Sequence, residues 1–233
     1  MRLDKFLSDM KCATRSQLKK DIRAGLVTVN GEMVRQSDFA VDENKDKVGY
    51  KGTIYEYEKF VYYMLNKPAG VVSATEDKKD KTVVDLLKDI GRDDLFPMGR
   101  LDKDTEGLLI LTNDGALTHE LLSPTKHVEK VYECTLAEPF DVTQKEKLEQ
   151  GVDIGEKKLT MPAKVAILEE KKIALTILEG KFHQVKRMLQ AVGNEVIYLK
   201  RVRMGGLVLD ERLQPGEYRK LTSEEVKLLQ EKK

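Results

Sequence analysis

The first part of the chain changes from helical to strand-like spacing of its apolar positions. A short amphipathic helix is predicted by apolar residues at helical spacing, namely Leu3, Phe6, Leu7 and Met10. A second helix is predicted over residues 15–24. Two strand-like runs, 26–29 and 32–34, follow on either side of Asn30-Gly31, a dipeptide that favours the tight turn of a β-hairpin. Two helices and a hairpin predict a compact domain, to which we assign residues 1–48.

After this domain the apolar periodicity is first lost and then becomes mainly strand-like. Residues 42–59 are polar and contain glycine, which indicates a linker with short edge structure, and we assign the linker to residues 49–59. An aromatic-rich strand that ends at Pro68 opens a second domain, residues 60–233. Further strands are predicted over 108–112, 130–136, 163–168, 173–178, 195–198 and 207–209. Helices are predicted over 83–88, 117–122, 143–150 and 183–192, with a last one after Leu221 and capping-box spacing at Thr143/Glu146 and Thr222/Glu225. Since strands outnumber helices and the connections are irregular, we expect an α+β fold with a mixed, mostly antiparallel sheet.

Composition is typical of a globular protein. The 233 residues are 40% hydrophobic and 35% charged, with a formal net charge of +1. No apolar run approaches the ~20 residues that a membrane helix needs, and no secretory signal follows Met1, so we expect a cytoplasmic protein without membrane contact. Cys12 and Cys134 lie far apart in the sequence and are predicted to be packing thiols.

Basic residues are concentrated in two segments, although the total charge is near zero. Residues 1–35 hold eight basic and four acidic side chains, and residues 181–203 hold six basic and one acidic. Arg15, Lys19 and Arg23 are spaced four apart, so they form one cationic stripe along the second predicted helix. Such a stripe is either a solvated face or a contact surface for phosphates.

A single carboxylate, Asp102, stands out at the entrance to a buried strand. It lies in a charged loop just before the apolar run 108–111, and the turn signal Asn113-Asp114-Gly115 ends that run. Loops at the ends of rigid strands often carry chemistry, although an acidic loop is also a common solvated feature. The loop imitates the start of a calcium-binding EF-hand, but Asn113 stands where a bidentate glutamate is required.

A zinc site and a sugar hydrolase both fit the sequence poorly. His119, His127 and His183 lack the spacing of zinc ligands. Asp102 and Asp104 are too close in sequence to be assumed an opposed acid and base, which makes a sugar hydrolase a weak alternative.

Several motifs resemble those of the RsuA/RluA superfamily of RNA pseudouridine synthases, and in particular its RsuA, RluB, RluE and RluF branch. Residues 99–109, GRLDKDTEGLL, resemble the catalytic motif, and residues 129–136, EKVYECTL, resemble the second motif. Residues 180–188, GKFHQVKRM, resemble the third motif. The N-terminal segments 2–7, 14–16 and 25–31 resemble an S4 RNA-binding domain. The resemblance implies a small S4-like domain followed by a synthase domain with a mixed sheet.

The resemblance also implies roles for individual residues of the second domain. Asp102 corresponds to the essential aspartate, which acts either on the ribose or on the base. Tyr132 corresponds to the tyrosine that packs against the target base, and an aromatic face is suited to stacking on any base. Lys186 is expected to pair with Asp102, with Arg187 as the reserve candidate, although relatives elsewhere in the superfamily carry arginine here. Arg100 is expected to organise the loop or to fill the space that the flipped base leaves.

By the same resemblance, the expected function is conversion of a uridine to pseudouridine in 16S rRNA, at uridine 516 in the usual rRNA numbering. The reaction requires base flipping but neither a cofactor nor a metal. The predicted substrate is 16S rRNA within a partly assembled small subunit, and the protein is predicted to be a monomer. The residues expected to bind RNA in the S4-like domain are Arg2, Lys5, Arg15, Lys19 and Arg23. Two alternatives remain, namely modification of large-subunit (23S) rRNA and a non-catalytic RNA-binding or ribosome-assembly factor.

Overall fold

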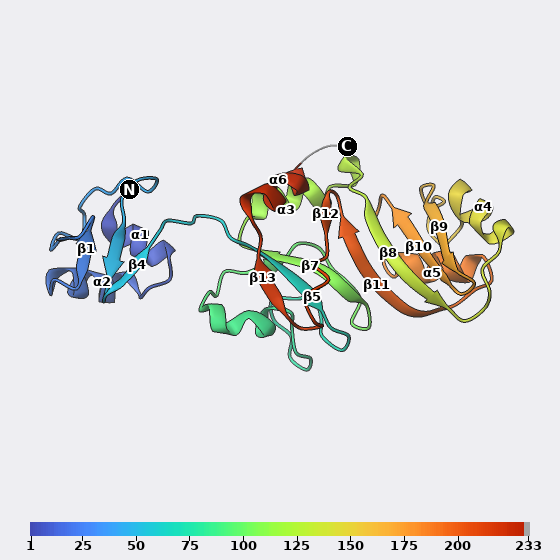
Figure 1. Cartoon of the computed structure of the whole chain (residues 1–233), viewed down its shortest axis with the longest axis horizontal. Coiled ribbons are helices and arrows are strands. Elements are labelled where there is room, and N and C mark those ends of the chain that lie inside the picture. Colours follow the sequence, from blue (N-terminus) through green and yellow to red (C-terminus); the bar gives the residue numbers. More distant parts are fainter. Residues whose placement is uncertain (231–233) are drawn as a thin grey trace. The chain divides into compact units, whose positions relative to one another are not determined.

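The computed structural model describes residues 1–230 and divides the chain into two compact units, Met1–Val61 and Tyr62–Lys233 (Figure 1). Residues 231–233, which we assigned to the second domain, lie outside the described part. No helix of the described part is both long enough and apolar enough to cross a bilayer.

The N-terminal unit contains the two predicted helices and a small sheet. Its helices are α1 (Leu3–Asp9) and α2 (Arg15–Arg23), and its strands are β1 (Val27–Val29), β2 (Glu32–Met33), β3 (Val48–Tyr50) and β4 (Thr53–Tyr55). The strands lie in the order β2-β1-β3-β4. Asn30 and Gly31 both have positive φ, as a tight hairpin turn requires. Leu3, Phe6 and Leu18 are fully buried, so the apolar positions that predicted the helices form the core of this unit.

The boundary between the units lies later than we predicted. Residues 48–55, which overlap the predicted linker 49–59, form β3 and β4 and pair with the N-terminal hairpin through β1. Val48 and Tyr50 are buried in that core. Two strands of three residues are too short to show periodicity in a polar sequence, which explains the difference.

The second unit is built on one long, mixed sheet. Its main strands are β5 (Tyr62–Lys67), β7 (Glu106–Thr112), β8 (Lys130–Leu136), β9 (Lys164–Glu169), β10 (Lys172–Ile177), β11 (Val196–Met204) and β13 (Tyr218–Lys220). Their order is β13-β5-β7-β11-β8-β10-β9, while the short strands β6 (Phe96–Pro97) and β12 (Leu207–Val208) pair with β7 and β11. Among the described strands, β7 and β11 form the one parallel pair. The expected mixed, mostly antiparallel α+β fold is therefore confirmed.

Helices and helical turns connect these strands. They are the 3₁₀ segments η1 (Val84–Ile90) and η2 (Pro124–Lys126) and the α-helices α3 (Gly115–Leu122), α4 (Val142–Gln150), α5 (Gln184–Ala191) and α6 (Ser223–Gln230). The capping box predicted for α6 is present, because Glu225 N donates to Thr222 Oγ1 and Thr222 N donates to Glu225. The capping box predicted for α4 is wrong in position, since the cap is formed by Asp141 with Gln144. Asp141 fills the cap position two residues earlier than Thr143.

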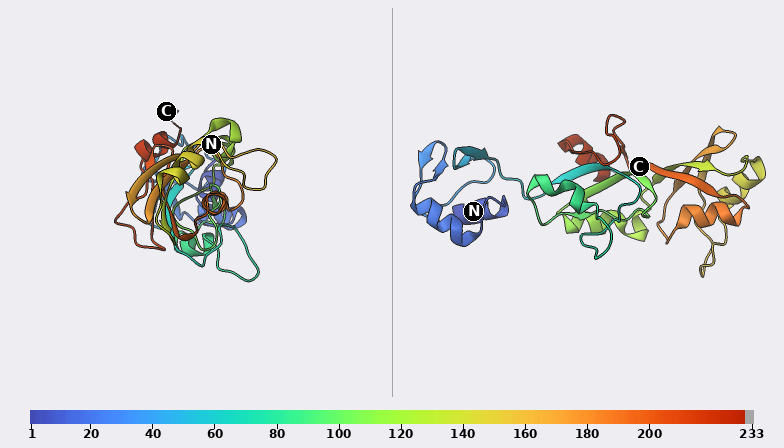
Figure 2. Two further views of the ribbon diagram at one scale, coloured as in Figure 1. Left: turned by 90° about the vertical axis from the view of Figure 1, so that its right-hand side faces the viewer. Right: turned by 90° about the horizontal axis from the view of Figure 1, so that it is seen from below.

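Strand β11 joins the two halves of the sheet, between β7 on one side and β8 on the other. It extends to Met204, well beyond the predicted strand 195–198. Cations at 200, 201 and 203 concealed this extension, because a run with three charged side chains in four positions does not show the apolar alternation that predicts a strand. Figure 2 shows the sheet from two further directions, with α5 packed beside β11.

Candidate active site

Asp102 lies in the loop that leads into β7, and hydrogen bonds to the backbone of this loop hold it in place. The apolar run that predicted β7 is fully buried from Leu108 to Leu111. Ser73 accepts a hydrogen bond from Leu101 N at 3.1 Å and donates one to Leu101 O at 2.9 Å. Thr105 N donates to Asp102 O at 3.1 Å. The carboxylate is thus carried by a loop that is fixed immediately before and after it.

Lys67, at the end of β5, anchors the same loop from within the protein. Its side chain is fully buried, and its Nζ donates towards the carbonyl oxygens of Asp102 at 3.0 Å, Lys103 at 3.2 Å and Thr105 at 2.8 Å. Burial lowers the pKa of Lys67 to about 8, although the nearby carboxylates of Asp104 and Asp102 oppose this change. Sequence reasoning assigned no role to Lys67. The sequence feature that could have identified it is a lysine within a predicted strand, directly before a proline.

Lys186 is the cation that faces Asp102. Its Nζ lies 3.4 Å from Asp102 Oδ2, and it also contacts Asp104 at 2.6 and 2.8 Å. Hydrogen bonding to Lys186 lowers the pKa of Asp104. His183 Nε2 lies 3.7 Å from Asp102 Oδ1, on the other side of the carboxylate. Asp102 therefore has two nitrogen-bearing side chains beside it, of which the lysine is the nearer.

Arg187, the reserve candidate, points elsewhere. Its Nη1 donates to Glu156 and to the carbonyl of Phe182, both at 3.0 Å, and its Nη2 donates to the carbonyl of Ile154. The structure therefore brings Lys186 to Asp102 and uses Arg187 to hold neighbouring loops.

Helix α5 fixes the position of Lys186. As its amphipathic pattern predicted, Val185, Met188 and Leu189 are buried on one face. Gln184 is also buried and donates to Glu179 at 2.8 Å, which ties the first turn of the helix to the end of β10. Lys186 lies on the opposite, accessible side of the helix.

A cavity of about 700 Å³ opens beside Asp102, entirely within the second unit. This volume is typical of sites for small molecules and single nucleotides. Tyr132 on β8 is 8% exposed and lines the cavity, and Arg100 lies exposed at its edge. The predicted residues Arg100, Asp102 and Tyr132 thus surround one cavity, and Lys186 reaches it through its contact with Asp102.

Arg201 and Lys130 are among the cations that line the cavity without having been predicted as site residues. Arg201 on β11 is 2% exposed, and its Nε donates to Leu108 O at 2.8 Å. Lys130 on β8 donates to Val128 O at 3.1 Å, and burial, followed by the charge of Arg201, lowers the pKa of Lys130 to about 8. Thr105 contributes a buried hydroxyl oxygen that has no partner in the described structure. The cavity therefore contains buried polar groups as well as an aromatic face.

Gly107 allows β7 to approach β11 closely enough to place these groups together. It pairs with Arg201 in the parallel ladder and has a φ of +101°. A Cβ atom at this position would lie 2.2 Å from Arg201 O. A side chain would therefore separate the strand that carries Arg201 from the strand that follows the Asp102 loop.

In the N-terminal unit, the five predicted RNA-binding residues lie at the surface of α1 and α2. Arg2 and Arg15 both contact the buried carboxylate of Asp4, at 3.0 and 3.5 Å. Lys5 lies 3.9 Å from Asp9. The two remaining cations of the predicted stripe, Lys19 and Arg23, are exposed on α2. A single buried aspartate thus contacts one arginine at the N-cap of α1 and one at the start of α2.

Comparisons with known proteins agree with this arrangement. Residues 61–191 match the family model of RNA pseudouridylate synthase, and residues 1–46 match the S4 domain. The chain is 49% identical to the uncharacterised RNA pseudouridine synthase YtzG of Bacillus subtilis (strain 168), covering 99% of each chain. It is 43% identical to ribosomal small subunit pseudouridine synthase A of Escherichia coli (strain K12), covering 97% of this chain and 98% of the relative. A crystal structure of a pseudouridylate synthase is 41% identical and superimposes with a TM-score of 0.69, covering 98% of this chain and 99% of the other.

The match to the synthase family model spans more than half of the chain, and the relatives align with this chain over nearly its full length. An enzyme of this family isomerises uridine within RNA, which fits a cavity with a carboxylate at its edge and an aromatic side chain within it. The chain therefore belongs to the RNA pseudouridine synthase family and carries an S4 RNA-binding domain at its N-terminus.

Proposed function

We propose that this protein converts one uridine of small-subunit rRNA to pseudouridine, at uridine 516 in the usual rRNA numbering. The observation that carries the proposal is the pairing of Asp102 with Lys186 at a cavity that Tyr132 lines. The naming of several full-length relatives as ribosomal small subunit pseudouridine synthase A supports the choice of RNA.

The chemistry proceeds by exchange of one bond at the ribose. The C1′–N1 bond breaks, the base turns, a C1′–C5 bond forms, and the proton on C5 is lost while N1 gains one. In our proposal Asp102 supplies the carboxylate beside the glycosidic bond, and the ammonium group of Lys186 lies 3.4 Å from it. Tyr132 offers its ring to the flipped base, and Arg100 lies at the edge of the cavity where it can occupy the space left in the RNA.

Lys67 contributes by holding the backbone around Asp102 in position. Three carbonyl oxygens of the loop converge on one ammonium group, so the carboxylate is fixed before RNA binds. A site that is organised in advance does not spend binding energy on ordering the loop.

We further propose that the protein acts as a monomer. The exposed cations of the S4 domain are proposed to hold the RNA through its phosphates. We further propose that the substrate is the rRNA of a partly assembled small subunit, where the target strand is still open.

The proposal is tested by release of tritium from C5 of uridine in small-subunit rRNA. Native protein is expected to release the label, and Asp102→Asn is expected to abolish release. Asp104→Asn is the matched control, because Asp104 also contacts Lys186 but does not line the cavity. Equal activity of native protein and Asp102→Asn would remove Asp102 from the mechanism.

The target is tested separately by mapping pseudouridine in both rRNAs of a strain that lacks this protein. We expect loss at uridine 516 alone, and loss at a position in large-subunit rRNA would refute the substrate. Comparison of naked rRNA with an assembly intermediate as substrate then tests the proposed state of the subunit.

A further inference from the structure

The inner wall of the cavity carries two positive side chains, and no carboxylate contacts either of them in the described structure. Arg201 is 2% exposed, and its Nη2 is buried without a hydrogen-bond partner among the described residues. Lys130 has one described hydrogen bond, to the carbonyl of Val128. Burial of a charged donor without a partner is costly.

The register of the sheet explains why these cations meet Tyr132. Lys130 and Tyr132 are two residues apart on β8, so their side chains lie on the same face of the strand. Arg201 is the partner of Tyr132 on the neighbouring antiparallel strand β11. Cross-strand partners share a face, and all three side chains line the cavity.

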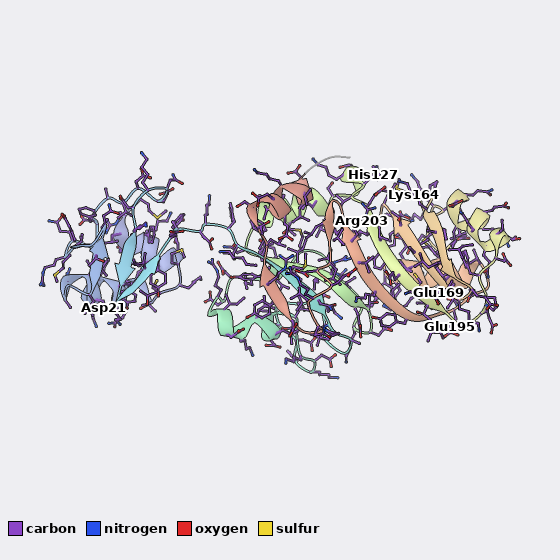
Figure 3. All side chains as sticks on the ribbon, in the orientation of Figure 1. Asp21, His127, Lys164, Glu169, Glu195 and Arg203 are labelled. Carbon is purple, nitrogen blue, oxygen red and sulfur yellow. The ribbon has the colours of Figure 1, made fainter. Side chains whose placement is uncertain are left out.

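Three other cations on or near these two strands contact carboxylates. Lys164 and Arg203, labelled in Figure 3, contact Glu129 at 2.7 and 2.8 Å. Lys172 on β10 lies 3.4 Å from Glu133. The sheet thus has acidic residues available for its exposed cations, whereas the two cations of the cavity wall are left for a ligand.

We propose that Lys130 and Arg201 bind the carbonyl oxygens of the flipped uracil and stabilise the negative charge that the base carries while it is detached from the ribose. This inference rests on the function proposed above. When the C1′–N1 bond breaks, both of its electrons remain with the base, and the charge spreads onto the ring oxygens. The charge is neutralised when C5 forms the new bond to C1′, and the proton that C5 then loses is balanced by the proton that N1 gains. Fixed donors that face such a developing charge lower the barrier, because they need no rearrangement.

The burial of Arg201, beside the half-buried Lys130, favours the base over a phosphate as the group that the two cations bind. Arg201 is almost completely buried, and Tyr132 beside it is 8% exposed. A base that enters the cavity reaches this wall, whereas the RNA backbone remains at the entrance, where Arg100 is exposed.

The test compares Lys130→Met with native protein in single-turnover reactions at saturating RNA, together with the dissociation constant for the same RNA. Methionine keeps most of the length of the side chain and removes the charge. We expect the saturating rate to fall by about 100-fold, with RNA affinity changed by less than about 2-fold. Lys172→Met is the matched control, since it removes a lysine of the same sheet that has a carboxylate partner, and it is expected to react as native protein does.

A second substrate tests whether the two cations act on cleavage of the glycosidic bond. RNA with 5-fluorouridine at the target position carries a base that leaves more readily as an anion. Loss of 5-fluorouridine from nuclease digests then reports cleavage of the glycosidic bond. If the cations stabilise the leaving base, the defect of Lys130→Met is expected to shrink to about 10-fold or less with this RNA.

Three results would overturn the inference while the native enzyme remains active. They are an unchanged rate in Lys130→Met, an equal defect with both bases, and a loss of RNA affinity at an unchanged saturating rate, which would assign the pair to a phosphate. Arg201→Lys, which retains a positive charge, checks the second cation, and circular dichroism of both variants establishes that they are folded. Native protein that releases no label from any rRNA would instead refute the proposed function, and this inference with it.

Discussion

Replacement of Gly107 by alanine tests whether the close approach of β7 and β11 builds the site. The added Cβ would lie 2.2 Å from Arg201 O and 2.9 Å from Arg201 N, and distances under 3.0 Å are essentially never seen for Cβ atoms. The two strands must therefore move apart by roughly 1 Å, which disturbs the parallel ladder and forces a packed core to adjust.

Gly193, just after α5, provides a matched control for this substitution. Its φ of +82° imposes a similar conformational penalty, but no atom lies within 4 Å of an added Cβ. A non-glycine residue at positive φ costs about 1–2 kcal/mol, and this is the whole effect expected for Gly193→Ala. Gly107→Ala carries that cost and about 1–3 kcal/mol of overpacking, so we expect it to lose about 2–5 kcal/mol in total.

Urea unfolding of the full-length variants, followed by far-UV circular dichroism, measures this difference, and the unchanged N-terminal unit serves as an internal reference. Hydrogen exchange over residues 106–112 and 196–204 shows whether the loss of stability is located in β7 and β11. A displacement of about 1 Å at a catalytic group lowers activity by about 100-fold, so Gly107→Ala is also expected to react about 100-fold more slowly than Gly193→Ala. Equal destabilisation of the two variants, or a native rate in Gly107→Ala, would refute the reasoning.

Further predictions concern the buried charges and the S4 domain. The folded pKa of Lys67 is about 8 against an ordinary 10.5, so the unfolded chain binds more protons between these values and stability rises with pH across this window. At about 1.4 kcal/mol for each pH unit, the difference in unfolding free energy between native protein and Lys67→Met should grow by about 3 kcal/mol from pH 8 to 10.5, and a constant difference in urea titrations would contradict this. Burial raises the pKa of Asp4 while Arg2 and Arg15 lower it by more, so its net pKa is lowered and its contribution to stability should be lost as acid titrates the folded carboxylate. Acid unfolding of Asp4→Asn, followed by circular dichroism, should lack that component, and identical acid transitions would exclude it. Deletion of residues 1–61 should weaken RNA binding and reduce its salt dependence while the second unit stays folded, and unchanged values in filter-binding titrations would remove the S4 domain from the binding model.

The sequence alone determined the elements whose pattern is local. The apolar run 108–111 predicted a buried strand, and the spacing of Val185, Met188 and Leu189 predicted an amphipathic helix that presents cations on its other side. The motifs around Asp102 and Tyr132 identified the family. In each case the signal lies within a few residues of the element that it predicts, so periodicity and short motifs are sufficient.

Tertiary structure decided which charges meet. Lys186 and Arg187 are neighbours with similar chemistry, and their choice of partner depends on the rotation of α5 against the Asp102 loop. Lys67 and Arg201 are distant from Asp102 in sequence, and they reach the site because β5 and β11 flank the strand that follows it. A local pattern records whether a residue is apolar or charged, whereas the electrostatic partner of a buried cation is fixed by strand order and register, which depend on the packing of the whole sheet.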